Sequence, residues 1–412
     1  MKILQLTKKF PFPLKDGEVI AITSLAKAFK ALGCEISLLS MNTTRHFFDS
    51  KQLPDTFNHY HSTDLVTVDN RIKVVDAFLN LFSNQSYHIS RFISKEFEDK
   101  LIAILQHNEF DIIQLETLYL APYVDTIRRY SKAKIVMRSH NVEHEIWKRI
   151  AENTATSAKK MYLQLLTKRL ENFELQYLNK YDMMVAITQR DLNFFKKLGC
   201  SIPAHVSPIG LNTADYLPSE PTVDKTTFSF IGSLDWMPNM EGLRWVLEKV
   251  WPKVLKKAPH AEFHIAGKNA PDYLLNGQWD QVFVHGEVPD AAAFINQHDV
   301  MLVPLFSGSG MRVKILEGMA LGRVVLSTQL GLEGIHAKHQ ENVLIADTVA
   351  DFSQQILSCI EHPQIIKLLS KKAVQFVQQH YDNVVIAQDL LVFYQQLLAE
   401  NGPFDIAPTS IS

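Results

Sequence analysis

The sequence has no apolar run of 18 residues, no short repeat or low-complexity tract, and only three cysteines. Without such a run, a transmembrane helix is not expected. Cys34, Cys200 and Cys359 are odd in number and widely spaced, which is typical of free thiols in a reducing cytosol. The apolar start, Met1–Leu6, is too short for a signal peptide and is soon followed by two lysines. We therefore expect a cytoplasmic protein.

An excess of charge of one sign is also missing. The 42 lysine and arginine residues balance 44 acidic residues, for a formal net charge of −2, so we expect no nucleic-acid partner. No Asp-x-Asp motif occurs, so the sequence offers no evident carboxylate pair for a divalent metal ion bound to a diphosphate. We expect neither a metal ion nor another cofactor to be required.

Short apolar segments alternate with helical patterns along the whole chain, which predicts an α/β fold with parallel sheets covered on both faces. A chain of 412 residues fits two domains of roughly 200 residues each. The expected strands are 2–6, 35–40, 111–115, 134–138 and 183–187 in the first half, and 228–232, 262–266, 282–285, 300–304, 324–327 and 343–345 in the second.

Prolines and a glycine interrupt regular structure over 203–225, so we place the domain break there. The expected first domain is 1–205 and the second is 206–382. A terminal helix over 383–400 has no partner in its own half, and we expect it to pack back on the first domain. Both domains are expected to be doubly wound and Rossmann-like, facing each other across a cleft, because ligands of open parallel sheets bind beyond the carboxyl ends of the strands.

The segment Phe306–Gly322 is the most informative in the chain, because it places glycines and cations between a buried strand and a helix. Glycines let the backbone approach a ligand, and free amides with two cations at the helix start, near Met311, favour a phosphate group. Glu317, one to two turns deeper, could accept hydrogen bonds from a ribose. The segment thus predicts a nucleoside-diphosphate site made by Gly308, Ser309, Gly310, Met311, Arg312 and Lys314.

Two loops of the first half follow expected strands. Gly17 ends the first loop at a helix start, where its backbone could approach a phosphate; the loop is not G-x-G-x-x-G, and a surface turn is the alternative. His140 ends the strand 134–138 and could bind a substrate hydroxyl or be structural. With Glu143 and His144 it also matches the H-x-x-E-H motif of zinc peptidases. We disfavour zinc, because His140 precedes the helix and the two imidazoles would diverge.

Three loops of the second half could face the same ligand. Gly232 and Ser233 follow the strand 228–232, and we favour Asn239 as the N-cap of the next helix. Val288 follows the strand 282–285, whose end could hydrogen-bond a base edge. Glu333 follows the strand 324–327, where it could contact a sugar hydroxyl or form a turn.

Together these loops resemble the retaining, nucleotide-sugar-dependent glycosyltransferases of the GT-B fold, called group 1 or family 4. The resemblance covers nearly the whole chain. It rests, in chain order, on FPFPLKDGE, RSHNVEHEIW, VSPIGLN, FIGSLDWMPNMEGLRW and VPLFSGSGMRVKILEGMALGRVVLST with GLEGI. The last block is the most specific.

The resemblance implies roles for individual residues. The family's two glutamates, which are separated by seven intervening residues, correspond to Ser309, a departure, and Glu317, which would contact the ribose. His140 would contact the donor sugar, and Gly17 would lie near the phosphate. The family's arginine and lysine after the first strand of the second domain are missing here. Arg312 and Lys314 are the natural substitutes.

The resemblance therefore implies a cytoplasmic enzyme that moves a sugar from a UDP- or GDP-sugar to a hydroxyl of a glycan or lipid-linked acceptor, with retention and without a metal. Tyr87, Arg91 and Glu116 are weak acceptor candidates. A weak peripheral contact of the helix Lys159–Leu178 with a membrane is an alternative to a solvated amphipathic helix, which we favour. We expect a monomer or weak dimer. Rival hypotheses are an epimerase or phosphorylase on the same fold, a zinc peptidase, and a non-catalytic sugar-nucleotide binder.

Overall fold

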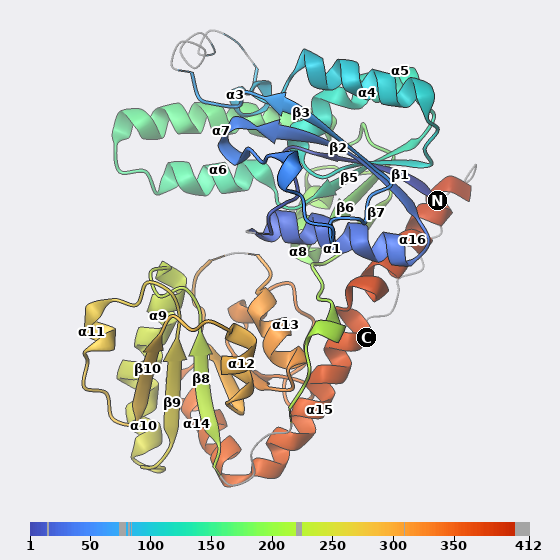
Figure 1. The fold of residues 1–412 in the computed structure, drawn as a ribbon. Coiled ribbons are helices and arrows are strands. Elements are labelled where there is room, and N and C mark those ends of the chain that lie inside the picture. The colour runs from blue at the N-terminus through green and yellow to red at the C-terminus, as the bar shows by residue number, and fades with distance from the viewer. Residues whose placement is uncertain are drawn as a thin grey trace. The chain divides into compact units, whose positions relative to one another are not determined.

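The computed structural model describes residues 1–14, 16–73, 80, 83, 85–219, 225–308 and 310–399. The chain divides into two compact units, each drawn with its own sheet in Figure 1. Unit 1 contains Met1–Pro208 and the segment from Ile386 onward, and unit 2 contains Ile209–Val385. No helix within the described ranges combines the length and apolarity needed to span a membrane.

Unit 1 is built on a parallel sheet of order β3-β2-β1-β4-β5-β6-β7. Its strands are β1 (Lys2–Thr7), β2 (Glu35–Thr43), β3 (Ser62–Val68), β4 (Ile112–Leu115), β5 (Lys134–Ser139), β6 (Met183–Ala186) and β7 (Ala204–Val206). Its helices are α1 (Gly17–Ala31), α3 (Tyr87–Ser90), α4 (Lys95–His107), α5 (Val124–Tyr130), α6 (Glu143–Glu152), α7 (Ser157–Tyr177) and α8 (Gln189–Lys197). The chain reverses its direction of winding between β1 and β4, which are neighbours.

Both faces of this sheet are buried, because successive apolar side chains along a strand point to opposite faces. In β1, Leu4 and Leu6 belong to the core that includes Phe97 and Leu101 of α4. Ile3 belongs instead to the core under α1 and the C-terminal helix. Continuous apolar strands of this kind are what the sequence predicts for a parallel sheet.

Unit 2 repeats the plan with a parallel sheet of order β10-β9-β8-β11-β12-β13. Its strands are β8 (Thr227–Ile231), β9 (Glu262–Ala266), β10 (Val282–Gly286), β11 (Val300–Val303), β12 (Val324–Ser327) and β13 (Leu344–Ile345). Its helices are α9 (Met237–Trp245), a π-helical turn (Val246–Val250), α10 (Trp251–Leu255), α11 (Asp272–Leu275), α12 (Ala291–Asn296), α13 (Val313–Ala320), α14 (Val349–Glu361) and α15 (Pro363–His380).

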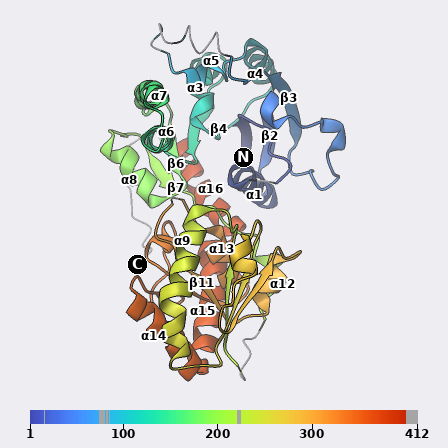
Figure 2. The ribbon, with the colours of Figure 1, turned by 90° about the vertical axis from the view of Figure 1, so that its left-hand side faces the viewer.

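The second sheet is also covered on both faces. α9, α10 and α14 pack on one face, whereas α13 and α15 pack on the other. In Figure 2 the helix α9 crosses in front of this sheet. The winding reverses between β8 and β11, so the loops that follow these two strands leave the sheet side by side.

The last helix, α16 (Asn383–Ala399), begins in unit 2 and continues into unit 1. Ala387, Leu390 and Tyr394 are fully buried in the same core as Ile3 and Ile112. The α/β GT-B-like class, with two Rossmann-like sheets and a C-terminal helix on the first domain, is therefore confirmed. All eleven expected strands are present, and β3 and β7 were not expected.

Candidate active site

The two cations of the Phe306–Gly322 segment lie at the start of α13, directly beyond the carboxyl ends of β8 and β11. Lys314 Nζ donates to the Ile231 carbonyl and to Asn239 Oδ1, both at 3.2 Å, and lies 5.0 Å from the centroid of the Phe230 ring. Burial, reinforced by the charge of Arg312, lowers the pKa of Lys314 to about 8. The ammonium group is thus held at the end of β8 by a carbonyl, an amide oxygen and an aromatic ring.

Asn239 holds Lys314 in place rather than capping a helix. The N-cap of α9 is Trp236, and Asn239 is the third helical residue, so the predicted cap is wrong. Its buried side chain donates to the Ser233 carbonyl at 2.9 Å while its oxygen accepts from Lys314. Gly232 makes room for this contact, because a Cβ there would lie 2.8 Å from Asn239 Nδ2. Sequence reasoning missed this role, since Asn239 and Lys314 are 75 positions apart.

The loop before α13 needs glycine for its backbone conformation. Gly308 and Gly310 have φ angles of 97° and 87°, in the left-handed region that side chains disfavour. α13 begins at Val313, two residues later than expected, with Arg312 as its N-cap. Arg312 Nη1 donates to the Gly310 carbonyl. Ser309, the position that departs from the family pattern, lies outside the described residues.

Positive charge accumulates at this helix start. Arg312 and Lys314 lie at the positive end of the α13 macrodipole. Like charges are unfavourable there without a ligand, and a bound anion would stabilise them. Burial lowers the pKa of Arg312, while the nearby charge of Glu333 opposes that shift. Glu333 Oε2 is buried and has no hydrogen-bond partner within the described part of the chain.

The other predicted residues of unit 2 differ in their burial and in their contacts. Glu317 accepts from the Tyr216 hydroxyl at 3.0 Å, which fixes one of its oxygens, and both burial and the charge of Glu317 raise the pKa of Tyr216. Met311 is half-buried and packs on the core beneath α13. Val288 is half-buried in the loop after β10, the edge strand of the sheet. Ser233 is exposed, and its hydroxyl donates to Asp235.

In unit 1, His140 follows β5 and is bound to a buried carboxylate. Its Nε2 lies 2.8 Å from Glu116 Oε2, and because an ionised carboxylate only accepts, Nε2 carries the proton. Arg138 Nη1 donates to the same oxygen at 3.0 Å. Although burial opposes ionisation, Arg138 and His140 lower the pKa of Glu116 to about 2. The imidazole is therefore held in one orientation by a fixed charge.

Further donors surround Glu116, which is fully buried. Gln5 and Gln114 donate to its other oxygen, and Tyr394 of α16 donates to Gln114 Oε1 at 2.6 Å. Both oxygens of Glu116 thus accept hydrogen bonds from within the protein. Glu116 cannot contact the acceptor substrate, so that candidate is wrong. The network joins residues that lie in or directly after β1, β4 and β5, and only the strand order brings them together.

Gly17 is the first residue of α1, which lies beside this network: Arg138 Nη1 is 3.5 Å from the Ala21 carbonyl. Asp16 caps α1 by accepting from the Val19 amide at 3.1 Å. A Cβ added at Gly17 would meet no atom within 4 Å, and its φ is not in the left-handed region. Nothing within the described protein therefore requires glycine at this exposed position.

The two histidines of the H-x-x-E-H motif serve different carboxylates. His144 Nδ1 lies 2.6 Å from Glu174 Oε2, whereas His140 binds Glu116. Glu174 of α7 also accepts from the Glu143 and His144 amides at the start of α6, both at 3.2 Å. This arrangement explains the motif as a helix cap, and within the described ranges no cluster of three or more such side chains could hold a metal ion.

Residues 225–362, which hold most of the site of unit 2, match the family model described as glycosyl transferases group 1. This part of the chain is therefore similar to the group 1 glycosyltransferases. The chain is 22% identical over 398 residues, 93% of this chain and 97% of the other, to an uncharacterized 44.6 kDa protein in the cps region of Klebsiella pneumoniae.

Solved structures share the fold of this chain over nearly its whole length. Sucrose-phosphate synthase from Thermosynechococcus elongatus matches with a TM-score of 0.65 at 15% identity, covering 97% of this chain and 100% of that one. HepE from Anabaena in complex with UDP-glucose matches with a TM-score of 0.59 at 15% identity, covering 96% and 100%. At this identity the likeness shows the GT-B fold alone.

Proposed function

We propose that this chain is a group 1 glycosyltransferase that transfers a sugar from a UDP- or GDP-sugar to an acceptor hydroxyl, with retention and without a metal ion. The observation that carries the proposal is the placement of Arg312 and Lys314 at the start of α13, next to the point where the winding of the second sheet reverses. Glu317 lies farther along the same helix. The HepE complex with UDP-glucose supports this donor class.

The chemistry follows from the charge of the site. The bond from the anomeric carbon to the diphosphate breaks, and the diphosphate leaves with the electron pair. Arg312, Lys314 and the α13 amides stabilise the developing negative charge, which is the electrostatic task most effective in catalysis. The acceptor oxygen bonds to the same face of the anomeric carbon, and its proton leaves with the diphosphate. No side chain acts as a covalent nucleophile.

The other predicted residues take supporting roles in this proposal. Glu317, fixed by Tyr216, accepts from the ribose hydroxyls, and Gly17 lets backbone amides approach the phosphate. His140 contacts the donor sugar, as the resemblance implies, and the Glu116–Arg138 pair orients its imidazole. The Klebsiella relative in a cps region supports a role in polysaccharide synthesis at the cytoplasmic side of the membrane, with a glycan or lipid-linked acceptor.

The first test is substitution of the two cations. Arg312→Ala and Lys314→Ala should each lower donor turnover by roughly 10²-fold, because each would stabilise charge that develops in the transition state. Lys249→Ala, which removes an exposed lysine of the π-helical turn, is the matched control. The donor is first identified by thermal-shift screening against UDP, GDP, ADP and their sugars. Unchanged hydrolysis and transfer in both variants would remove the cations from the mechanism.

Retention and metal independence need separate measurements. Proton NMR of the initial product should give the same anomeric configuration as the donor, and turnover should persist in excess EDTA. Inversion, or loss of activity that a divalent metal restores, would overturn these two parts of the proposal. Free epimerised sugar formed without acceptor would favour the epimerase hypothesis. Nucleotide binding with no turnover would favour a non-catalytic binder, which the serine at position 309 suggests.

A further inference from the structure

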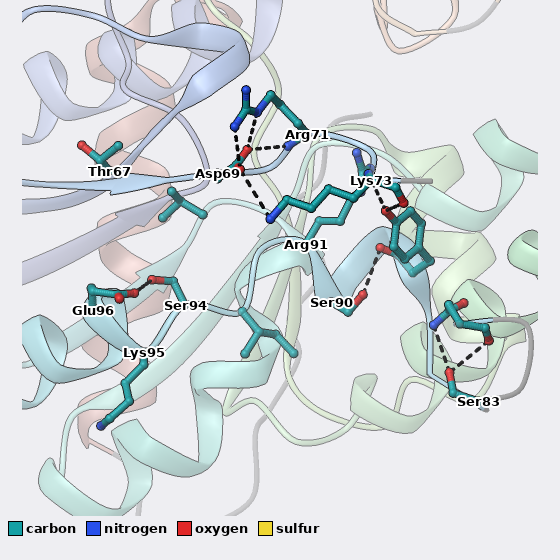
Figure 3. Close-up of a pocket in the computed structure, with 14 residues that line it drawn as sticks. Thr67, Asp69, Arg71, Lys73, Ser83, Ser90, Arg91, Ser94, Lys95 and Glu96 are labelled. Atoms are coloured by element: carbon teal, nitrogen blue, oxygen red, sulfur yellow. Dashed lines mark hydrogen bonds and ion pairs between the residues drawn. The ribbon is translucent and has the colours of Figure 1, made fainter. Parts of the chain in front are cut away.

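A pocket of about 800 Å³ lies in unit 1, at the carboxyl end of β3 and beside the starts of α3 and α4 (Figure 3). Its lining is polar and rich in cations, and includes Asp69, Arg71, Lys73, Tyr87, Arg91 and Lys95. No residue assigned above to the donor or to His140 lines it. The pocket is large enough for a sugar with an attached charged group, since small-molecule sites commonly measure 300–1,000 Å³.

Most of these cations are neutralised by a neighbouring carboxylate. Arg71 Nε and Lys73 Nζ lie 2.8 and 3.6 Å from the carboxylate of Asp69, toward which Figure 3 shows both side chains turned. Lys95 pairs with Asp99 at 3.0 Å. These residues shape the rim of the pocket, and each of the three cations has a carboxylate within ion-pair distance.

Arg91 differs, because no carboxylate of the described chain pairs with it. Its Nη1 donates to the Asn70 carbonyl at 3.2 Å, and its Nε is buried without a hydrogen-bond partner in the described part of the chain. The guanidinium carbon lies 5.6 Å from the Tyr87 ring centroid and 5.9 Å from that of Phe92. Burial, with the charge of Arg45, lowers the pKa of Arg91, yet a guanidinium stays charged.

An unbalanced, half-buried guanidinium held against aromatic rings is a receptor for an oxyanion, because it is desolvated in advance and presents paired N–H donors. We propose that this pocket binds the acceptor through an anionic group, a phosphate, diphosphate or carboxylate, with Arg91 as the main contact. A lipid diphosphate, a sugar phosphate and a uronic acid all carry such an anionic group.

The pocket opens at the same edge of the sheet as His140, since the carboxyl ends of parallel strands lie at one edge. A chain of contacts leads from the pocket to the start of α1. Phe92, next to Arg91, packs on Tyr119 with ring centroids 4.8 Å apart, and Lys8 Nζ lies 4.5 Å from the Tyr119 ring centroid. Lys8 in turn pairs with Glu18, beside Gly17, at 3.1 Å. The identification of the anion as part of an acceptor rests on the proposed transferase function. The binding of an anion at Arg91 does not.

The test measures anion binding in the full chain by calorimetry, with inorganic pyrophosphate, farnesyl diphosphate, glucuronate and neutral glucose as probes. At least one anionic probe should bind the wild-type chain more tightly than glucose. Arg91→Ala should weaken that binding at least tenfold. Preference for farnesyl diphosphate, pyrophosphate or glucuronate would identify a lipid, phosphate or carboxylate source.

Two controls keep the result specific. Arg129→Ala removes an exposed arginine of α5 outside the pocket lining and should leave anion binding unchanged. Arg91→Lys keeps the charge but loses the planar fork, so it should still weaken binding if Arg91→Ala does not fold. Equal affinity in both Arg91 variants and the wild type, or no anion binding by the wild type, would overturn the proposal.

Donor hydrolysis separates this proposal from the transferase function. The Arg91 variants should hydrolyse donor without acceptor at the wild-type rate, since Arg91 contacts no residue assigned to the donor, while transfer to an anionic acceptor falls. Loss of donor hydrolysis in the Arg91 variants would contradict a separate acceptor subsite. If the wild-type chain binds no nucleotide sugar but still binds anions through Arg91, the transferase function fails and the anion site stands.

Discussion

Lys314 is a residue of the candidate site whose ionisation is altered by its surroundings. Burial and Arg312 lower its pKa to about 8, whereas a bound diphosphate would raise that pKa again. Donor binding should therefore take up a proton near pH 8. Because the ligand favours the protonated lysine, the dissociation constant of the nucleoside diphosphate should be nearly constant below pH 7.5. It should rise by up to tenfold per pH unit above pH 8.

Isothermal titration between pH 7 and 9.5, in buffers of different ionisation enthalpy, measures both the affinity and the proton uptake. Lys314→Arg is the control, because arginine stays charged over this range and should remove the pH dependence. The same slope in wild type and Lys314→Arg would show that another group titrates.

The sequence predicted the two cations of the candidate site but not the residues that contact them. Arg312 and Lys314 were predicted because they sit next to glycines in one short segment. The contact of Lys314 with Asn239, and of Glu116 with Arg138 and His140, depends on loops that follow different strands. Such contacts carry no local pattern, and they become visible only when the order of strands in the sheet is known.

At the scale of elements, most of the strands that the sequence predicted have buried residues on both faces, although β10, a partly exposed edge strand, was predicted as well. β4 and β6 are fully buried, and their apolar sequences, IIQL with one glutamine and MMVA, predict strands. β3 was missed because it is an edge strand, STDLVTV, in which only Val68 is buried. β7 was missed because it has three residues. A strand exposed at an edge has weaker demands on its sequence, so its pattern is weaker.

The start of α1 offers a prediction that separates stability from function. Since Gly17 has open space around its Cβ position and an ordinary φ, Gly17→Ala should raise the free energy of unfolding by about 0.4–1 kcal/mol, through the unfolded state. If a phosphate approaches this backbone, the new methyl group should lower donor turnover. A displacement of about 1 Å can cost roughly 10²-fold.

Chemical denaturation and donor turnover are compared for Gly17→Ala and for Lys27→Ala, an exposed change on the same helix. A stabilised Gly17→Ala variant with full turnover would show that no ligand group approaches Gly17.

At the scale of the whole molecule, the chain crosses between its units twice, because α16 returns to unit 1 after unit 2 is complete. Unit 1 therefore depends on a segment that follows unit 2 in the sequence. Leu390 of α16 is fully buried in the core with Ile3 and Ile112, so Leu390→Ala should destabilise unit 1 by about 2–5 kcal/mol. Val377 of α15 is equally buried in unit 2 and serves as the matched control.

Calorimetric unfolding tests this prediction if the units unfold separately. A nucleotide should raise the transition of unit 2, which holds its proposed site. Leu390→Ala should lower the transition that the nucleotide leaves unchanged, whereas Val377→Ala should lower the one that the nucleotide raises. A Leu390→Ala variant that shifts only the nucleotide-sensitive transition would place the C-terminal helix in unit 2. That result would contradict the division of the molecule on which the two-domain fold rests.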